Sequence, residues 1–305
     1  MSDLKLFQAS SSTMVELESS SAPLEKGLQT QFEKNLDTLL GVRFLAIEYV
    51  TSHGGRMDTL GIDENGYPVI IEYKRDRSEN VINQGLFYLD WLMDHRGDFE
   101  LLVRDRYGKE AADQIEWSAP RLICIAADFT KYDEHAIKQM GRNIELVRYR
   151  KFGEDLLLLE LLTAVSASAS TKPTIPSLKS SGAGSSGYKT VSDYMNDMSP
   201  QLAELFADVE TFLLGRGDDV TKKVTRFYLA YRRIKNFVCL EVRPTLGQLK
   251  LFLKIDPSTV ELKDGFARDV RKIGHFGTGD LELTIASHDD FERPKELILR
   301  SYEES

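Results

Sequence analysis

The sequence predicts two folded units: an α/β unit in which helices flank a mixed sheet, and a separate, small α+β unit after it. Three observations lead to this prediction. The chain has 305 residues, a length that suits about two domains of ordinary size. Residues 163–187 consist mainly of Ser, Ala, Gly, Thr and Pro, and such a composition cannot bury a core. Helical and strand patterns interleave before this stretch, whereas after it a group of strands lies between helices.

These breaks in composition divide the chain into four segments. We expect a loosely ordered N-terminus over residues 1–21, because it contains two runs of serine. A first folded unit is expected over 22–162, a flexible linker over 163–187, and a second folded unit over 188–305.

Composition and charge exclude several classes of protein. Apolar residues make up 42% and charged residues 29%, which are values typical of globular proteins. No apolar run approaches the length of a membrane span, so no membrane partner is expected. The net charge of −9 argues against a chain that coats nucleic acid non-specifically. The chain shows no secretory signal, and Cys124 and Cys239 each lie in an apolar strand-like run, so we expect buried thiols in a cytoplasmic protein.

In the first unit, apolar residues at helical spacing predict a helix from Leu24 to Leu40 that ends at Gly41. Asn65-Gly66 is a strong hairpin signal between two strand patterns. The remaining patterns predict strands near 43–50, 57–63, 67–74, 121–127, 144–150 and 156–162, and helices near 79–95, 99–115 and 132–140.

The residues with a chemical signature lie on the predicted hairpin. Asp58 is on its first strand, and Glu72 and Lys74 are two apart on the second, so their side chains share one face. Charged side chains on an apolar strand are costly unless they are paired or bind a metal. Asp58 and Glu72 could supply oxygen ligands to Mg²⁺, and Lys74 could act on a water molecule or on a phosphate.

Asp58 followed after thirteen residues by Glu72-Tyr73-Lys74 resembles the PD-(D/E)XK nuclease superfamily, in which an Asp and an (Asp/Glu)-x-Lys motif lie on a β-hairpin. Met57 stands where the superfamily's motif has Pro. Glu33 lies on the preceding helix, where members of the superfamily often carry an additional metal-site Glu.

Gln84 and Tyr88 match the Gln-x-x-x-Tyr element of the RecB-like branch, which is thought to contact the substrate near the cleaved phosphate. Residues 24–125 resemble the nuclease domain of archaeal and actinobacterial mismatch-cleaving endonucleases, whose Gly-Arg-x-Asp strand corresponds here to the strand with Arg56. The resemblance does not extend to the DNA-binding domain that precedes it in those enzymes. Arg56 is either a phosphate contact or a surface arginine on a turn.

The resemblance implies a restriction-endonuclease-like fold and a Mg²⁺-dependent endonuclease, with Mn²⁺ as the alternative cation. Asp58, Glu72 and Lys74 would be catalytic, Glu33 would join the two carboxylates as a metal ligand, and DNA is favoured over RNA. Such an activity is compatible with a role in DNA repair or in defence against foreign DNA. A homodimer is also compatible with it. The alternative is a non-catalytic nucleic-acid-binding or protein-interaction module that retains the nuclease fold.

In the second unit, apolar spacing predicts a helix over 193–214, a glycine-rich turn at 273–280 and a closing helix over 294–302. Residues 222–238 alternate basic and aromatic side chains. They form either a nucleic-acid-binding face or an ordinary hairpin around Ile234–Asn236 with tyrosines inward and a basic outer face. Residues 200–303 resemble an uncharacterised family, a domain of unknown function sometimes labelled a predicted transport protein.

Overall fold

The computed structural model describes residues 4–20, 26–52, 54–74, 80–153, 155–165 and 189–305. The chain divides into two compact units, residues 1–168 and 169–305, and each is described by itself. Most of the expected linker lies outside the described residues, but its first three residues belong to a strand. No helix among the described residues is both long enough and apolar enough to cross a membrane.

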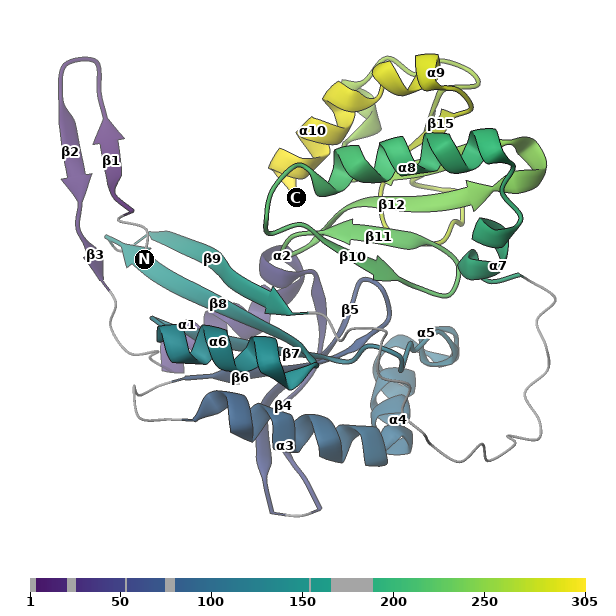
Figure 1. The fold of residues 1–305 in the computed structure, drawn as a ribbon. Helices are drawn as coiled ribbons and strands as arrows, with labels where there is room; N and C mark the ends of the chain where they lie inside the picture. Colours follow the sequence, from purple (N-terminus) through teal and green to yellow (C-terminus); the bar gives the residue numbers. More distant parts are fainter. Residues whose placement is uncertain (1–3, 21–25, 53, 75–79, 154, 166–188) are drawn as a thin grey trace. The chain divides into compact units, whose positions relative to one another are not determined.

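The first unit is built on a seven-stranded mixed sheet in the order β3-β8-β7-β6-β5-β4, with β9 paired to β8 (Figure 1). Strands β6, β7 and β8 are parallel and the other pairs are antiparallel. The prediction of a mixed sheet with flanking helices is therefore confirmed. The strands are β3 (Ser19–Ser20), β4 (Val42–Val50), β5 (Arg56–Asp63), β6 (Pro68–Tyr73), β7 (Arg121–Ala126), β8 (Asn143–Phe152) and β9 (Leu156–Val165).

Helices pack on both faces of this sheet. Leu89 and Leu92 of α3 join Ile70 and Leu122 in one core. On the other face, Phe32 of α1 packs edge-to-face against Tyr73 and Tyr149, with ring centroids 6.1 and 6.4 Å apart. The central strands are thus buried on both sides, as parallel strands usually are. The helices are α1 (Lys26–Lys34), α2 (Leu36–Leu40), α3 (Val81–Asp94), α4 (Arg96–Tyr107), α5 (Lys109–Asp113) and α6 (Lys131–Met140).

Two expected helices are each divided in the structure. The helix expected over residues 24–40 breaks at Asn35, whose side chain donates to the carbonyl of Gln31 while its backbone leaves helical geometry. The helix expected over 99–115 breaks at Gly108, whose φ of 88° only glycine adopts readily. The predicted helix end at Gly41 is confirmed, with a φ of 64°.

The hairpin predicted at Asn65-Gly66 is present, and a buried ion network holds its turn. Arg121 of β7 donates to Asp63 at 2.7 Å and to both carboxylate oxygens of Glu145 at 2.9 and 2.7 Å. Asp63 also accepts from the backbone amides of Asn65 and Tyr67. This network connects the turn of the hairpin to β7 and β8 at the centre of the sheet. It thereby holds β5 and β6 in place at the turn.

The N-terminal segment differs from the expected loose chain. β1 (Leu6–Ala9) and β2 (Met14–Leu17) form an antiparallel hairpin, and β3 then joins the main sheet beside Phe152 and Lys151. The first of the two serine runs forms the turn of this hairpin, where Ser10 and Thr13 hydrogen-bond to each other, and the second includes β3.

The second unit contains an antiparallel six-stranded sheet in the order β10-β11-β12-β13-β15-β14. One face packs on α8 and α10 through a core that includes Leu205, Val209 and Ile298. The helix expected over 193–214 is divided, because Ser199 caps a new helix at Pro200. The elements are α7 (Val191–Asn196), α8 (Pro200–Leu214), β10 (Thr221–Val224), β11 (Leu229–Arg232), β12 (Asn236–Arg243), η1 (Pro244–Leu246), β13 (Gln248–Leu253), η2 (Pro257–Thr259), β14 (Ala267–Asp269), β15 (Leu281–Ile285), α9 (His288–Glu292) and α10 (Lys295–Glu304).

The basic and aromatic stretch of this unit is a hairpin of β11 and β12, as one of the two interpretations held. The prediction that this hairpin has a basic outer face is only partly confirmed. Arg232 is 2% exposed and donates to the carbonyl of Ile234 in the turn of the hairpin. Lys222 pairs with Glu210 at 2.7 Å and Arg233 with Asp219 at 2.6 Å. These cations are paired within the unit, which favours the structural interpretation over a nucleic-acid-binding face.

Candidate active site

Asp58 and Glu72 meet where the pairing of β5 with β6 ends. The ladder runs from Ile62 opposite Pro68 to Thr59 opposite Ile71. Beyond it, Glu72 Oε1 accepts from the Asp58 amide at 3.2 Å, and Asp58 Oδ2 accepts from the Tyr73 amide at 3.0 Å. The two carboxylates thus take the place of the next backbone hydrogen bonds. This exchange fixes both side chains between strands that are beginning to separate.

Burial makes the Glu72 carboxylate costly. Glu72 is 1% exposed, and burial, followed by the nearby Asp58 carboxylate, raises its pKa from 4.5 to about 8. A carboxyl group in this position is ionised at neutral pH only if a positive charge compensates for it. Two neighbouring carboxylates, of which Glu72 is almost fully buried, form a donor set for a hard divalent ion.

Lys74 lies directly after the end of β6, two residues beyond Glu72, and a helix holds its side chain. Its side chain is 9% exposed, and its Nζ lies 3.8 Å from Asp133 Oδ2 and 5.8 Å from the centre of the Phe129 ring. Asp133 belongs to the capping box at the start of α6, in which it bonds reciprocally with Thr130. Sequence reasoning missed Asp133, although the Thr-x-x-Asp spacing is a recognisable capping signal.

Glu33 does not join the two carboxylates. Its Oε1 accepts from Gln29 at 2.9 Å and from the Thr59 hydroxyl at 3.4 Å. Thr59 and Asp58 are adjacent on a strand and face opposite sides of the sheet, and helix α1 covers the side of Thr59. No group of three or more His, Cys, Asp or Glu in the described ranges is placed to hold one metal ion. The structure therefore brings together two of the three expected carboxylates.

Tyr88 positions the strand that carries Asp58. Its buried hydroxyl accepts from the Arg56 amide at 3.1 Å and from the Gln84 amide group at 3.1 Å. A Cβ on Gly55 would lie 2.6 Å from the Tyr88 ring, so the close approach requires glycine there. The Gln-x-x-x-Tyr pair is therefore intact, with Gln84 exposed and Tyr88 anchoring the backbone two residues before Asp58.

Two further residues of this region are Arg56, whose phosphate contact stays a prediction, and Cys124. The Arg56 guanidinium lies 3.8 Å from Glu48, and both side chains are about half exposed. Cys124 sits beside Glu72 in the parallel register of β6 and β7. Burial, then Glu72, raises the pKa of its thiol, so Cys124 is no nucleophile. Both cysteines are buried free thiols, as expected.

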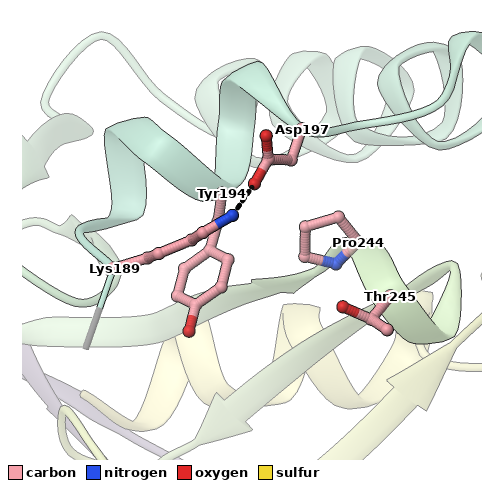
Figure 2. Close-up of a pocket in the computed structure, with 5 residues that line it drawn as sticks. All are labelled: Lys189, Tyr194, Asp197, Pro244 and Thr245. Atoms are coloured by element: carbon pink, nitrogen blue, oxygen red, sulfur yellow. Dashed lines mark hydrogen bonds and ion pairs between the residues drawn. The ribbon is translucent and has the colours of Figure 1, made fainter. Parts of the chain in front are cut away.

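Two cavities lie away from the carboxylate pair. One, of about 410 Å³, opens between α1 and β4 and is lined by Thr30, Glu33, Lys34, Phe44, Ile47 and Arg106. The other, of about 470 Å³, lies in the second unit between α7 and η1 (Figure 2). There Lys189 and Asp197 form a 2.6 Å ion pair beside Tyr194, so these two charges satisfy each other.

A family model matches the second unit. Residues 191–305 match the model described as a domain of unknown function, DUF5655. A Haemophilus influenzae protein described as uncharacterised is 25% identical over 299 residues, which cover 97% of this chain and 98% of that protein. The similarity to this relative thus extends over both units.

Two solved structures are similar to part of the chain. A repair endonuclease from Pyrococcus abyssi is 20% identical with a TM-score of 0.27, over 42% of this chain and 50% of that one. An EndoMS–dsDNA complex is 22% identical with a TM-score of 0.24, over 39% of this chain and 42% of that one. The chain thus spans half or less of the length of these solved proteins.

Proposed function

We propose that the first unit is a divalent-cation-dependent endonuclease that hydrolyses phosphodiester bonds in DNA. The observation that carries this proposal is the placement of Asp58 and Glu72 at the end of the β5–β6 ladder, each anchored by a backbone amide of the opposite strand. Carboxylates held this way cannot relax away from each other, although their mutual repulsion favours separation.

Mg²⁺ suits this donor set, and Mn²⁺ is the alternative. Asp58 and Glu72 would hold the ion through oxygen atoms, with water completing the coordination, and oxygen ligands of this kind suit a hard divalent cation. When bound, the cation would polarise a phosphoryl oxygen and lower the pKa of a water molecule. Glu33, on the opposite face of the sheet, would influence this site only through Thr59.

Lys74 is proposed to donate to the attacking water or to the phosphate. Its ammonium group is nearly excluded from solvent, so a hydrogen bond from it to a charged oxygen is stronger than in water. Asp133 holds this ammonium in position from α6 and would release or share it when an anionic substrate arrives. Gln84, exposed on α3, donates one amide N–H to Tyr88 and would offer the other to a phosphate, while Tyr88 keeps the Asp58 strand in place.

A cleavage panel tests the proposal. Purified protein is incubated with single-stranded, branched and mismatched DNA in Mg²⁺, in Mn²⁺ and in a chelator, and the products are resolved on denaturing gels. Cleavage in either cation is expected, and Asp58→Asn and Lys74→Ala should abolish it. Asp113→Asn and Lys109→Ala, at exposed positions of α5, are the matched controls and should cleave normally. Absence of cleavage, or equal cleavage by both sets of variants, contradicts the proposal.

The second candidate is a non-catalytic nucleic-acid-binding or protein-interaction module. The pairing of Lys74 with Asp133 favours it, because the lysine is already satisfied by a neighbouring helix. This candidate predicts binding that needs no metal and that survives Glu72→Gln, measured as DNA affinity in the chelator. In either case the second unit would recognise the substrate or a partner.

A further inference from the structure

The N-terminal hairpin, hereafter the arm, exposes apolar side chains on both of its faces. Leu6 and Val15 lie on one face, 36% and 59% exposed, and Phe7 and Met14 lie on the other, 47% and 77% exposed. An isolated two-stranded hairpin is marginally stable in water, and apolar side chains on both faces make its exposure costly. We therefore expect the arm to pack on a partner surface.

The charges of the arm restrict what that partner is. Lys5 is its one cation among the described residues, and it pairs with Glu16 at 3.2 Å. A surface that binds nucleic acid needs several cations to neutralise phosphates, and one that lies on a membrane usually combines basic residues with apolar ones. The partner is therefore an apolar, nearly uncharged protein surface.

The chain itself carries a surface of this kind in β9. This ten-residue edge strand has β8 as its one neighbouring strand among the described residues. Its sequence, LLLLELLTAV, has a single charge, Glu160, which pairs with Arg148 at 2.6 Å. Leu156 and Leu157 are 48% and 36% exposed. A long apolar edge without free charges is a template for pairing with another chain.

The arm and the start of β9 lie at the same end of the sheet. Ser19 of β3 and Leu156 of β9 both pair with Phe152, so the arm leaves the sheet beside the turn that begins β9. Residues 6–17 of the arm and the ten residues of β9 give 22 residues per copy. This number is an upper limit, because Leu162 and Val165 of β9 pack on the core of their own unit, and it lies near the lower end of the roughly 20–30 residues that each partner contributes to a stable interface.

We infer that the chain forms a homodimer in which the arm of each copy packs on the β9 edge of the other. A two-fold axis makes the exchange reciprocal, so both arms and both edges are covered at once. The inference is independent of the nuclease proposal, because neither the arm nor β9 contains a residue of the carboxylate pair.

Sedimentation velocity of the full chain tests the inference, over a hundredfold range of micromolar concentrations. The wild type is expected to be a dimer, and the double variant Phe7→Lys/Met14→Lys a monomer. Leu246→Lys, which places one lysine at a 65% exposed leucine of the second unit, should remain dimeric. Trp91 and Trp117, the two tryptophans of the chain, both lie in the first unit, and their fluorescence verifies that this unit stays folded in each variant.

A disulfide trap identifies the surfaces in contact. Because the two natural cysteines are buried, Met14→Cys/Leu157→Cys introduces the accessible thiols. Oxidised glutathione should convert this variant to a covalent species of twice the chain mass, whereas Leu246→Cys should stay monomeric on a non-reducing gel. A monomeric wild type at all concentrations, a dimer that survives the arm substitutions, or absence of the covalent species overturns the inference.

Discussion

Replacing Glu72 by glutamine is expected to stabilise the metal-free protein at neutral pH and to abolish cleavage. The buried Glu72 carboxylate lies beside Asp58, and the structure keeps both in place through backbone amides. Glutamine retains an oxygen that can accept from the Asp58 amide, but it carries no charge to desolvate. If the substitution increases the stability of the protein and abolishes its activity, the Glu72 carboxylate serves function at a cost to the stability of the fold.

The size of the expected change in stability follows from the pKa of Glu72, which the folded environment raises from 4.5 to about 8. A carboxyl group with a raised pKa contributes fully to stability below its unfolded pKa, and that contribution is lost as the pH rises toward the folded pKa. At 1.36 kcal/mol per pKa unit, the wild type should lose about 3 kcal/mol of unfolding free energy between pH 5 and pH 7.5. Glu72→Gln should show no such loss, and at pH 7.5 it should be more stable by a similar amount.

Urea unfolding in a chelator, followed by tryptophan fluorescence, measures this difference in the first unit alone, because Trp91 and Trp117 both belong to it. Mg²⁺ should raise the unfolding midpoint of the wild type and leave that of Glu72→Gln unchanged. Glu110→Gln, at an exposed position of α5, is the matched control and should resemble the wild type in every measurement. If Glu72→Gln is less stable than the wild type at pH 7.5, or cleaves DNA normally, the reasoning is refuted.

Three further predictions concern the residues that support the two units. Arg121→Met should lower the unfolding free energy of the first unit by about 3–5 kcal/mol in urea, because it leaves Asp63 buried without its cation. An effect smaller than that of substituting an exposed arginine by methionine would contradict the role of the network. Tyr88→Phe removes the acceptor of the Arg56 amide and should cost about 1–3 kcal/mol while lowering kcat more than it changes KM; unchanged kcat would show that Tyr88 does not position Asp58. Burial raises the pKa of Glu241, so the stability of the second unit should fall as the pH rises through that pKa. Amide hydrogen exchange of β12 measures this stability, and Glu241→Gln should remove its fall with pH. An equal fall in both proteins would exclude Glu241 as the source.

The sequence predicts the sheet of the first unit well, because its strands are short apolar runs and its hairpin carries an Asn-Gly turn. It predicts the helices less well. Asn35 and Gly108 interrupt patterns whose apolar spacing continues across them, so periodicity alone does not locate the breaks. The arm was not predicted at all, since its serine-rich turn resembles a disordered segment and its apolar residues contact no core that a pattern could reveal.

The parts of the site that the sequence could not supply depend on which face of the sheet a helix covers. Helical spacing places Glu33 on a turn of α1, but only packing decides that this helix lies on the side of Thr59 and Tyr73. Likewise Asp133 is far from Lys74 in the sequence, and their contact arises because α6 begins beside the end of β6. Neither relation follows from local pattern, because both join elements that are distant along the chain.

The carboxylate pair, in contrast, follows from register. In the antiparallel pairing of β5 with β6, Ile62 is opposite Pro68 and Thr59 is opposite Ile71. The same register, extended by one residue on each strand, sets Asp58 opposite Glu72. A slip of one residue would turn Glu72 to the opposite face of the sheet, away from Asp58. The Asn-Gly turn and the buried Asp63–Arg121 contact hold this register from the other end of the hairpin. The chemistry of the site therefore depends on the turn and its ion network as much as on the carboxylates, and Arg121→Met should reduce cleavage even where the first unit remains folded.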